Sequence, residues 1–213
     1  MTLHYVLLVH GDASGATTRL HDPSDATTLR RGDDGLTITD GPFADLPEPV
    51  TGFETAEADD LDAAIALAAR HPAAIAGSIE VREVWEDFGV DEPHPRPAPG
   101  ARRYLFLHTN PVERDALPPT ADEPPSDWLA SEHTRRAVLE GDRLRPADRS
   151  TAATVRMHNG RPEVVLGRAG TLAEEIAGYD LVAVEDLDEA IALARPHPTL
   201  AIGAIEIRPL WTT

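Results

Sequence analysis

Two histidines, His10 and His108, end short apolar runs and are suited by type to acid–base chemistry. An imidazole titrates near neutral pH, and its nitrogens also bind metal ions. The nine histidines are scattered singly, without the His-x-x-x-His or His-Glu-x-x-His spacing of a helical metal site. We therefore expect no metal and no cofactor. His10 is a candidate catalytic residue, and His108 a candidate ligand-binding residue.

A second group of candidates is the run Asp40-Gly41-Pro42-Phe43. In a ligand pocket, Asp40 would act as a catalytic base or hydrogen-bond acceptor, and Phe43 would form an apolar wall that binds the ligand. The same residues also make a sharp turn at the exit of a hairpin, with Phe43 packed as a core plug. The turn interpretation is favoured, because the fold needs a turn at this point with or without a ligand.

Charge and composition limit the partners of these residues. The 213 residues contain 19 Lys and Arg against 37 Asp and Glu, for a formal net charge of −18. Such a polyanion is repelled by nucleic acids and anionic membrane surfaces. The absence of cysteine excludes disulfides and thiolate sites. Since no apolar run approaches the roughly 18 residues of a membrane span, we expect a cytoplasmic protein without nucleic-acid or membrane partners.

An internal repeat organises the chain. Segments 52–85 and 178–211 align without a gap at an offset of 126 residues, with 16 identities in 34 positions. At the first apolar run the offset is only 99, so the first copy lacks 126 − 99 = 27 residues that the second retains. A segment with proline at alternate positions separates the copies. We place unit one at 1–88, a linker at 89–101, and unit two at 102–213.

Each copy predicts the same order of elements: a buried strand, a hairpin, another strand, an amphipathic helix and a closing strand. Asp60 and Asp186 are placed to cap the helices. The second copy adds a helix over 126–140, closed by Gly141. The predicted fold class is α+β, with two ferredoxin-like units. The strands are expected at these residues: 5–9, 27–31, 36–39, 53–58 and 79–85, and 104–107, 154–157, 163–166, 179–184 and 205–211.

Three smaller expectations follow from the same pattern. Glu80 and Arg82, like their repeats 126 residues later, place opposite charges on one strand face, which is typical of a solvated or cross-strand pair. His71 and His197 precede proline at a helix end, where a cation complements the helix dipole, and we expect them to act as caps. The first strand is apolar on both faces although its copy lacks the first helix, so we expect the proline-rich loop 111–125, the linker or a second chain to cover it.

The residues Asp40-Gly41-Pro42-Phe43-Ala44, Gly52, and Gly77-x-Ile79-Glu80-Val81-Arg82 resemble the DGPF branch of the YCII-related family. The resemblance implies ferredoxin-like units that pair through their helix-free faces, here as a dimeric α/β-barrel-like pseudo-dimer from a tandem duplication. The second copy replaces the signature with 166–170, and the first copy lacks the first helix. The family's suggested His–Asp pair is not carried over. The nearest helix histidine, His133, is kept as a ligand-binding candidate.

The resemblance implies little about activity, because most members have none established, although some lie beside extracytoplasmic-function sigma factors. We expect an uncharacterised small-molecule-binding or regulatory accessory protein, either a monomeric pseudo-dimer or a homodimer. The alternative is a dimeric α/β-barrel enzyme, an isomerase, lyase or dehydrochlorinase, using acid–base chemistry in a cleft between the units. The sequence leaves open whether the protein is an enzyme.

Overall fold

A computed structural model describes residues 2–44, 48–87, 97–112, 126–167 and 173–211. Antiparallel strands dominate the described part of the chain, with about 50% of these residues in strands and 21% in helices. It divides into two compact units, each assembled from three separate segments. Unit 1 contains 1–23, 45–86 and 144–171, and unit 2 contains 24–44, 87–143 and 172–213.

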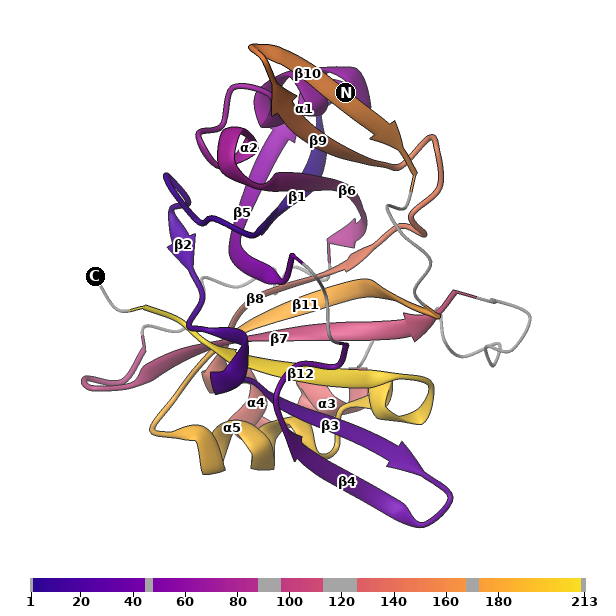
Figure 1. The fold of residues 1–213 in the computed structure, drawn as a ribbon. Coiled ribbons are helices and arrows are strands. Elements are labelled where there is room, and N and C mark those ends of the chain that lie inside the picture. The colour runs from indigo at the N-terminus through magenta and orange to yellow at the C-terminus, as the bar shows by residue number, and fades with distance from the viewer. Residues whose placement is uncertain (1, 45–47, 88–96, 113–125, 168–172, 212–213) are drawn as a thin grey trace. The chain divides into compact units, whose positions relative to one another are not determined.

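Unit 1 is built on six strands in the order β2-β5-β1-β6-β9-β10, all paired antiparallel. Two short helices follow β5 (Figure 1). The elements are β1 (Leu3–His10), β2 (Thr18–Arg19), β5 (Val50–Ala58), α1 (Leu61–Ala68), α2 (Ala73–Ala76), β6 (Ser78–Asp87), β9 (Ala152–His158) and β10 (Arg161–Leu166).

Unit 2 has the matching order β8-β11-β7-β12-β3-β4, again antiparallel. Its elements are η1 (Pro23–Asp25), β3 (Thr27–Gly32), β4 (Gly35–Asp40), β7 (Arg102–Pro111), α3 (Ser126–Ala130), α4 (Glu132–Ala137), β8 (Val138–Leu144), β11 (Glu174–Val184), α5 (Leu187–Ala194), η4 (Pro198–Ala201) and β12 (Ala204–Pro209).

The two halves of the sequence exchange their hairpins. The β3–β4 hairpin of the first half pairs with β12 of the second, and β9 of the second half pairs with β6 of the first (Figure 1). The units 1–88 and 102–213 describe the sequence repeat and stay a prediction. The two compact units of the structure have different boundaries. Much of the predicted linker at 89–101 lies outside the described residues.

The helix starts agree with the sequence. The carboxylates of Asp60 and Asp186 accept hydrogen bonds from the backbone N–H groups of Ala63 (2.8 Å) and Glu189 (2.9 Å). The carboxylate of Glu189 accepts in return from the N–H of Glu185 at 2.6 Å, which completes a reciprocal cap. Two orphan donors of the first turn are thereby satisfied, and α5 begins where its sequence predicts.

The two histidines that precede proline act as caps, but not in the way expected. The Nδ1 atoms of His71 and His197 accept hydrogen bonds from the N–H groups of Ala73 and Thr199, each at 3.2 Å. Each ring thus caps the start of the next helical turn as a neutral acceptor. The predicted capping role is confirmed for both residues, but each caps as an acceptor through Nδ1 and not as a cation at the end of the preceding helix.

One face of each sheet packs against that unit's helices. In unit 1 the cluster includes Tyr5, Leu7 and Val9 of β1 with buried alanines of α1 and α2. The intervening residues Val6 and Leu8 are also fully buried, so the expectation that this strand is not left open to water is confirmed. Its sequence can therefore be apolar on both faces.

The predicted fold class is wrong. The chain is mostly antiparallel sheet with few helices, and it is not an α+β ferredoxin-like, barrel-like pseudo-dimer. The helices α1 and α5 have eight residues each, while strands of up to eleven residues dominate. Val, Ile and Thr favour this outcome in the closing strands and hairpins because they fit a pleated surface.

The predicted helix over 126–140 is also shorter than expected. It breaks into α3 and α4, and the chain turns into strand β8 at Val138. Gly141 lies within that strand, where a Cβ would come within 2.3 Å of an Asp180 oxygen. A glycine expected to end a helix is therefore a site of close approach in a sheet. No helix in the described part of the chain is long and apolar enough to cross a membrane.

Candidate functional site

The sheet of unit 1 carries a line of polar side chains on the face away from its helices. In the antiparallel register, His10 lies opposite Ser78, and Leu8 lies opposite Glu80. Arg82 follows on the same side, because alternate residues of a strand share a face. The other alternate set, Ile79 and its neighbours, packs in the core cluster. Strand periodicity alone therefore gathers the polar groups.

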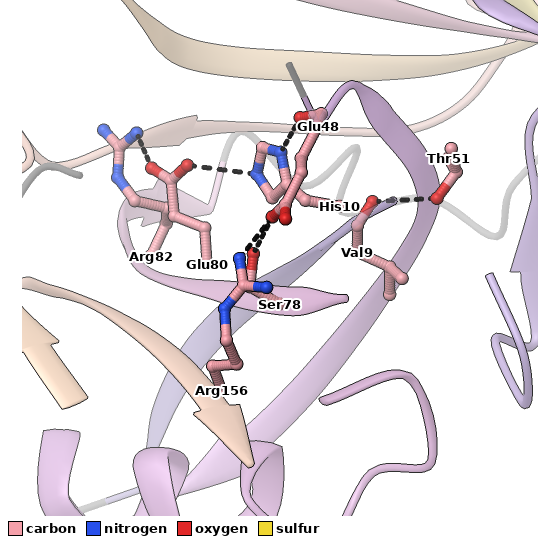
Figure 2. Close-up of polar contacts among 8 residues, drawn as sticks. All are labelled: Val9, His10, Glu48, Thr51, Ser78, Glu80, Arg82 and Arg156. Carbon is pink, nitrogen blue, oxygen red and sulfur yellow. Dashed lines mark hydrogen bonds and ion pairs between the residues drawn. The ribbon is translucent and has the colours of Figure 1, made fainter. Parts of the chain in front are cut away.

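A β-bulge directs His10 into this line. The register between β1 and β5 shifts after Val9, so that His10 lies opposite Val50 and Thr51 is passed over. The hydroxyl of Thr51 donates to the carbonyl of Val9 at 3.3 Å (Figure 2). Bulges of this kind re-aim a side chain at the end of a strand. Here the result brings His10 beside Glu48, just before β5.

The imidazole of His10 is held at both nitrogens (Figure 2). Nδ1 lies 3.0 Å from the backbone oxygen of Glu48, a contact in which Nδ1–H donates. Nε2 lies 3.3 Å from Oε2 of Glu80, whose Oε1 accepts from Arg82 at 3.0 Å. The side chain of Arg82 is 1% exposed, against 13% for His10 and 15% for Glu80. Two cationic groups thus flank one nearly buried carboxylate.

The electrostatics of this group favour the charged forms. Burial alone would lower the pKa of His10, but the hydrogen bond and charge of Glu80, with the backbone and charge of Glu48, raise it above its ordinary value. Burial would raise the pKa of Glu80, but His10 and Arg82 lower it to about 2. With His10 protonated, the chain His10–Glu80–Arg82 therefore holds two positive charges and one negative charge.

The outer edge of the site is an ion pair between Glu48 and Arg156. Oε2 of Glu48 accepts from Nη2 of Arg156 at 2.5 Å and from the hydroxyl of Ser78 at 3.2 Å (Figure 2). The Arg156 hydrogen bond is the leading cause that lowers the pKa of Glu48. Both partners are about 40% exposed. Arg156 comes from the exchanged hairpin, so the second half of the sequence completes a site in the first.

Unit 2 repeats this framework with one change. Arg30 pairs with Glu174, and Arg208 donates to Glu206 at 3.0 Å, each 126 residues from its unit 1 equivalent. The position that matches His10 holds Thr109, whose hydroxyl donates to Glu174 at 3.1 Å. The Glu–Arg pairs were expected to be solvated or cross-strand pairs. Instead, Glu206 and Arg208 pair within one strand and are 2% and 1% exposed. Because the pair is buried, removing either charge would leave the other unpaired and would destabilise the fold.

The signature Asp40-Gly41-Pro42-Phe43 lies in unit 2, apart from the unit that contains His10. Gly41 has φ of 95°, and its N–H donates to the carbonyl of Ala26, so the segment is a turn. Asp40 is exposed at the end of β4, and Phe43 is half-buried. The N–H of Phe43 donates to Glu206 at 2.9 Å. The motif thus stabilises a buried carboxylate of the other half.

The remaining candidates fall elsewhere in unit 2. His133 is 55% exposed on α4, 3.8 Å from Glu189. His108 is buried on the helix side of the sheet, where its Nε2 lies 2.8 Å from Oδ2 of Asp180. His197 approaches the same oxygen, and burial, followed by the charge of His108, holds the pKa of His197 well below its ordinary value. Within unit 2, His133, His108 and Phe43 contact different residues.

Glu48 and Arg156 were not among the residues predicted from the sequence. They are 108 residues apart and meet only because the hairpins are exchanged. A signal was nevertheless present, because Glu48 and Arg156 have equivalents 126 residues away in Glu174 and Arg30. A repeated pair of opposite charges in the two copies was the feature that could have identified them.

These observations define two six-stranded antiparallel units with matching strand order and matching ion pairs. Residues 31–87 match the YCII-related domain. This match confirms the family resemblance for that segment, which contains the DGPF turn, Glu48 and the Glu80–Arg82 pair. His10 and Arg156 lie outside the matched residues. No curated protein matches the chain in sequence.

Proposed function

We propose that the protein is a small-molecule-binding accessory protein, and that the helix-free face of unit 1 binds an anionic ligand beside His10. The observation that carries this proposal is the charged His10–Glu80–Arg82 chain, with contacts of 3.3 and 3.0 Å. Unit 2 has the uncharged Thr109 at the matching position, so the charge on His10 distinguishes one unit of an otherwise repeated framework.

Charge supports an anion as the ligand. With His10 protonated, His10, Arg82 and Arg156 carry three positive charges, and Glu48 and Glu80 carry two negative ones, so these five groups sum to +1. A local positive excess in a chain of net charge −18 concentrates small anions at this point. A carboxylate would contact Arg156, since a guanidinium presents several N–H donors in one plane.

Exposure supports entry from the Glu48–Arg156 side. These two side chains are 40% and 43% exposed, whereas Arg82 is closed off at 1%. A ligand would reach the outer pair first and the proton of His10 behind it. Surface ion pairs of this kind contribute at most about 1 kcal/mol, so a ligand displaces one at little cost.

The test is thermal unfolding of the full chain with acetate, succinate or benzoate, with chloride at matched ionic strength as control. The matched variant is His10→Thr, which installs the residue of unit 2. For a dissociation constant of ~1 mM, 10 mM ligand stabilises by about 1.4 kcal/mol, a rise of a few degrees. Equal shifts in wild type and variant, or none with any of the acids, would contradict the proposal.

A second candidate is an enzyme that transfers a proton from His10, an isomerase or lyase without the barrel architecture. The contact between His10 and Glu80 favours it, because a carboxylate at one imidazole nitrogen orients a general acid. The proton on Nδ1 would pass to the ligand in exchange for its hydrogen bond to the carbonyl of Glu48. The discriminating assay is exchange of ligand C–H hydrogens in D₂O by NMR, using any acid that binds. Binding without exchange supports the accessory protein, and exchange that His10→Thr abolishes supports the enzyme.

A further inference from the structure

A buried cluster of two imidazoles and a carboxylate lies on the helix side of unit 2. His108 is near the end of β7, Asp180 is in β11, and His197 caps η4. The Nε2 atoms of His108 and His197 lie 2.8 and 3.4 Å from Oδ2 of Asp180, and the three atoms are all within 4.8 Å of one another. His108, His197 and Asp180 are 8%, 4% and 6% exposed, respectively.

These three converging atoms are not satisfied by hydrogen bonds. In the described part of the chain, Nε2 of His108, Nε2 of His197 and Oδ2 of Asp180 are each buried without a hydrogen bond of acceptable geometry. Among the described residues, Asp180 forms ion-pair contacts with His108 and His197 only. Buried polar atoms in native proteins normally have a partner, so three facing one another indicate a missing one.

Unit 1 shows what the framework is like without this cluster. Glu54 and His71, 126 residues before Asp180 and His197, form the same pair with Nε2 3.4 Å from Oε1. Glu54 also accepts from the N–H of Thr17 at 2.5 Å, which satisfies its carboxylate. The position that matches His108 is Val9, which packs in the core. The third polar group is therefore specific to unit 2.

The surroundings of the cluster leave space for it and hold it in place. A Cβ on Gly178 would lie 3.1 Å from Nδ1 of His108, and one on Gly141 would lie 2.3 Å from Oδ1 of Asp180. The ring of His197 packs edge-on against Trp128 at a centroid separation of 4.5 Å. A larger residue at either glycine would displace the cluster, so its geometry is built into the sheet.

We propose that His108, Asp180 and His197 together bind one divalent transition-metal ion, with Zn²⁺ as the ion that suits the ligands best. Two imidazole nitrogens and one carboxylate oxygen form a common zinc ligand set. In a tetrahedral site with bonds of about 2.0–2.1 Å, ligand atoms lie about 3.3 Å apart. The observed separations from Asp180, 2.8 and 3.4 Å, need only small adjustments.

The sequence predicted no metal site because the spacing, 72 and then 17 residues, matches no helical motif. Metal binding would disturb the hydrogen bond by which His197 caps η4. Its Nδ1 accepts the N–H of Thr199, so the ring proton is on Nε2 before a metal binds. Coordination through Nε2 moves that proton to Nδ1, which then no longer accepts from the N–H of Thr199. Zinc binding therefore changes the amide environment of Thr199.

The experiment is calorimetric titration of chelator-treated full chain with ZnCl₂, repeated with Co²⁺ for its visible absorption. We expect one ion per chain and a tetrahedral Co²⁺ spectrum. His108→Val installs the residue of unit 1 and should lower affinity by about 100-fold or more, beyond what loss of a supporting residue costs. His133→Gln, which removes an exposed imidazole, should leave affinity unchanged.

Asp180→Asn provides a second variant if His108→Val fails to fold, as judged by circular dichroism without metal. It keeps the volume of the side chain and removes its charge, and it should also abolish stoichiometric binding. The proposal is overturned if wild type binds no ion at one equivalent. It is also overturned if folded Asp180→Asn or His108→Val binds as tightly as wild type, because the ion would then lie elsewhere.

Discussion

Replacing His10 by threonine tests the electrostatics of unit 1, because unit 2 has threonine at the matching position, Thr109. In the folded chain the pKa of Glu80 is about 2, against an ordinary value of 4.5. That difference corresponds to about 3 kcal/mol of favourable interaction with the carboxylate charge. His10 and Arg82 share it, so His10→Thr should lower the free energy of unfolding by about 1–2 kcal/mol.

The pH dependence of this loss has a definite sign. The pKa of His10 is raised in the folded protein, so its contribution is complete below about 6.5 and disappears as pH rises through the folded value. The pKa of Glu80 is lowered, so its contribution is present above about 4.5 and disappears as pH falls toward 2. The difference between wild type and His10→Thr should be largest between about pH 4.5 and 6.5.

The assay is urea unfolding, followed by tryptophan fluorescence and circular dichroism, at several pH values from 4.5 to 9. His133→Thr is the control, because that histidine is 55% exposed and its replacement should have little effect at any pH. The reasoning is refuted if the free-energy difference for His10→Thr stays constant, or grows, from pH 5 to pH 9.

Three further predictions follow from the contacts. Gly77→Ala should destabilise unit 1 by about 3 kcal/mol in urea unfolding, because its Cβ would lie 2.1 Å from the carbonyl oxygen of His10; Gly32→Ala, with no atom within 4 Å, should change stability by less than about 0.5 kcal/mol. Glu206→Gln should cost about 3 kcal/mol by leaving a buried arginine without its anion, whereas Glu48→Gln, about 40% exposed, should cost less than about 1 kcal/mol; equal losses would contradict the burial argument. Zinc at 100 times its dissociation constant should stabilise wild type by about 2.7 kcal/mol in thermal unfolding and leave His108→Val unchanged.

The sequence predicted the elements of the fold better than their arrangement. The repeat identified the helices after Asp60 and Asp186, and their capping bonds are present. The hairpins at 27–40 and 152–166 were also expected from their turn residues. These predictions succeed because caps and tight turns are decided by neighbouring residues.

The exchange of hairpins was beyond reach of the sequence, for a physical reason. A hairpin sequence specifies its own turn and register, but not the sheet edge that it joins. The two strands that a hairpin could join here, β6 and β12, are nearly identical in sequence: Ile79-Glu80-Val81-Arg82 and Ile205-Glu206-Ile207-Arg208. Local pattern therefore favours neither, and the connections between the elements decide the pairing.

The candidate residues were identified by residue type, but most of the side chains that surround them in the structure could not be predicted. His10 was selected because it ends a strand, but the bulge at Thr51 and the exchanged Arg156 that complete its surroundings are long-range features. His108 was selected as a ligand-binding residue, but Asp180 and His197 were not linked to it. Strand register brings Asp180 near His108, and a capping bond orients His197.

The most direct test of the account is an NMR titration of the imidazole of His10 in the intact chain, assigned by comparison with His10→Thr. The account predicts a pKa above 6.5, with a proton on both ring nitrogens below it, because Nε2 lies 3.3 Å from the Glu80 carboxylate and Nδ1 donates to the carbonyl of Glu48. A pKa at or below 6.5 would show that burial outweighs these partners, and would contradict the charged site on which the proposed function rests.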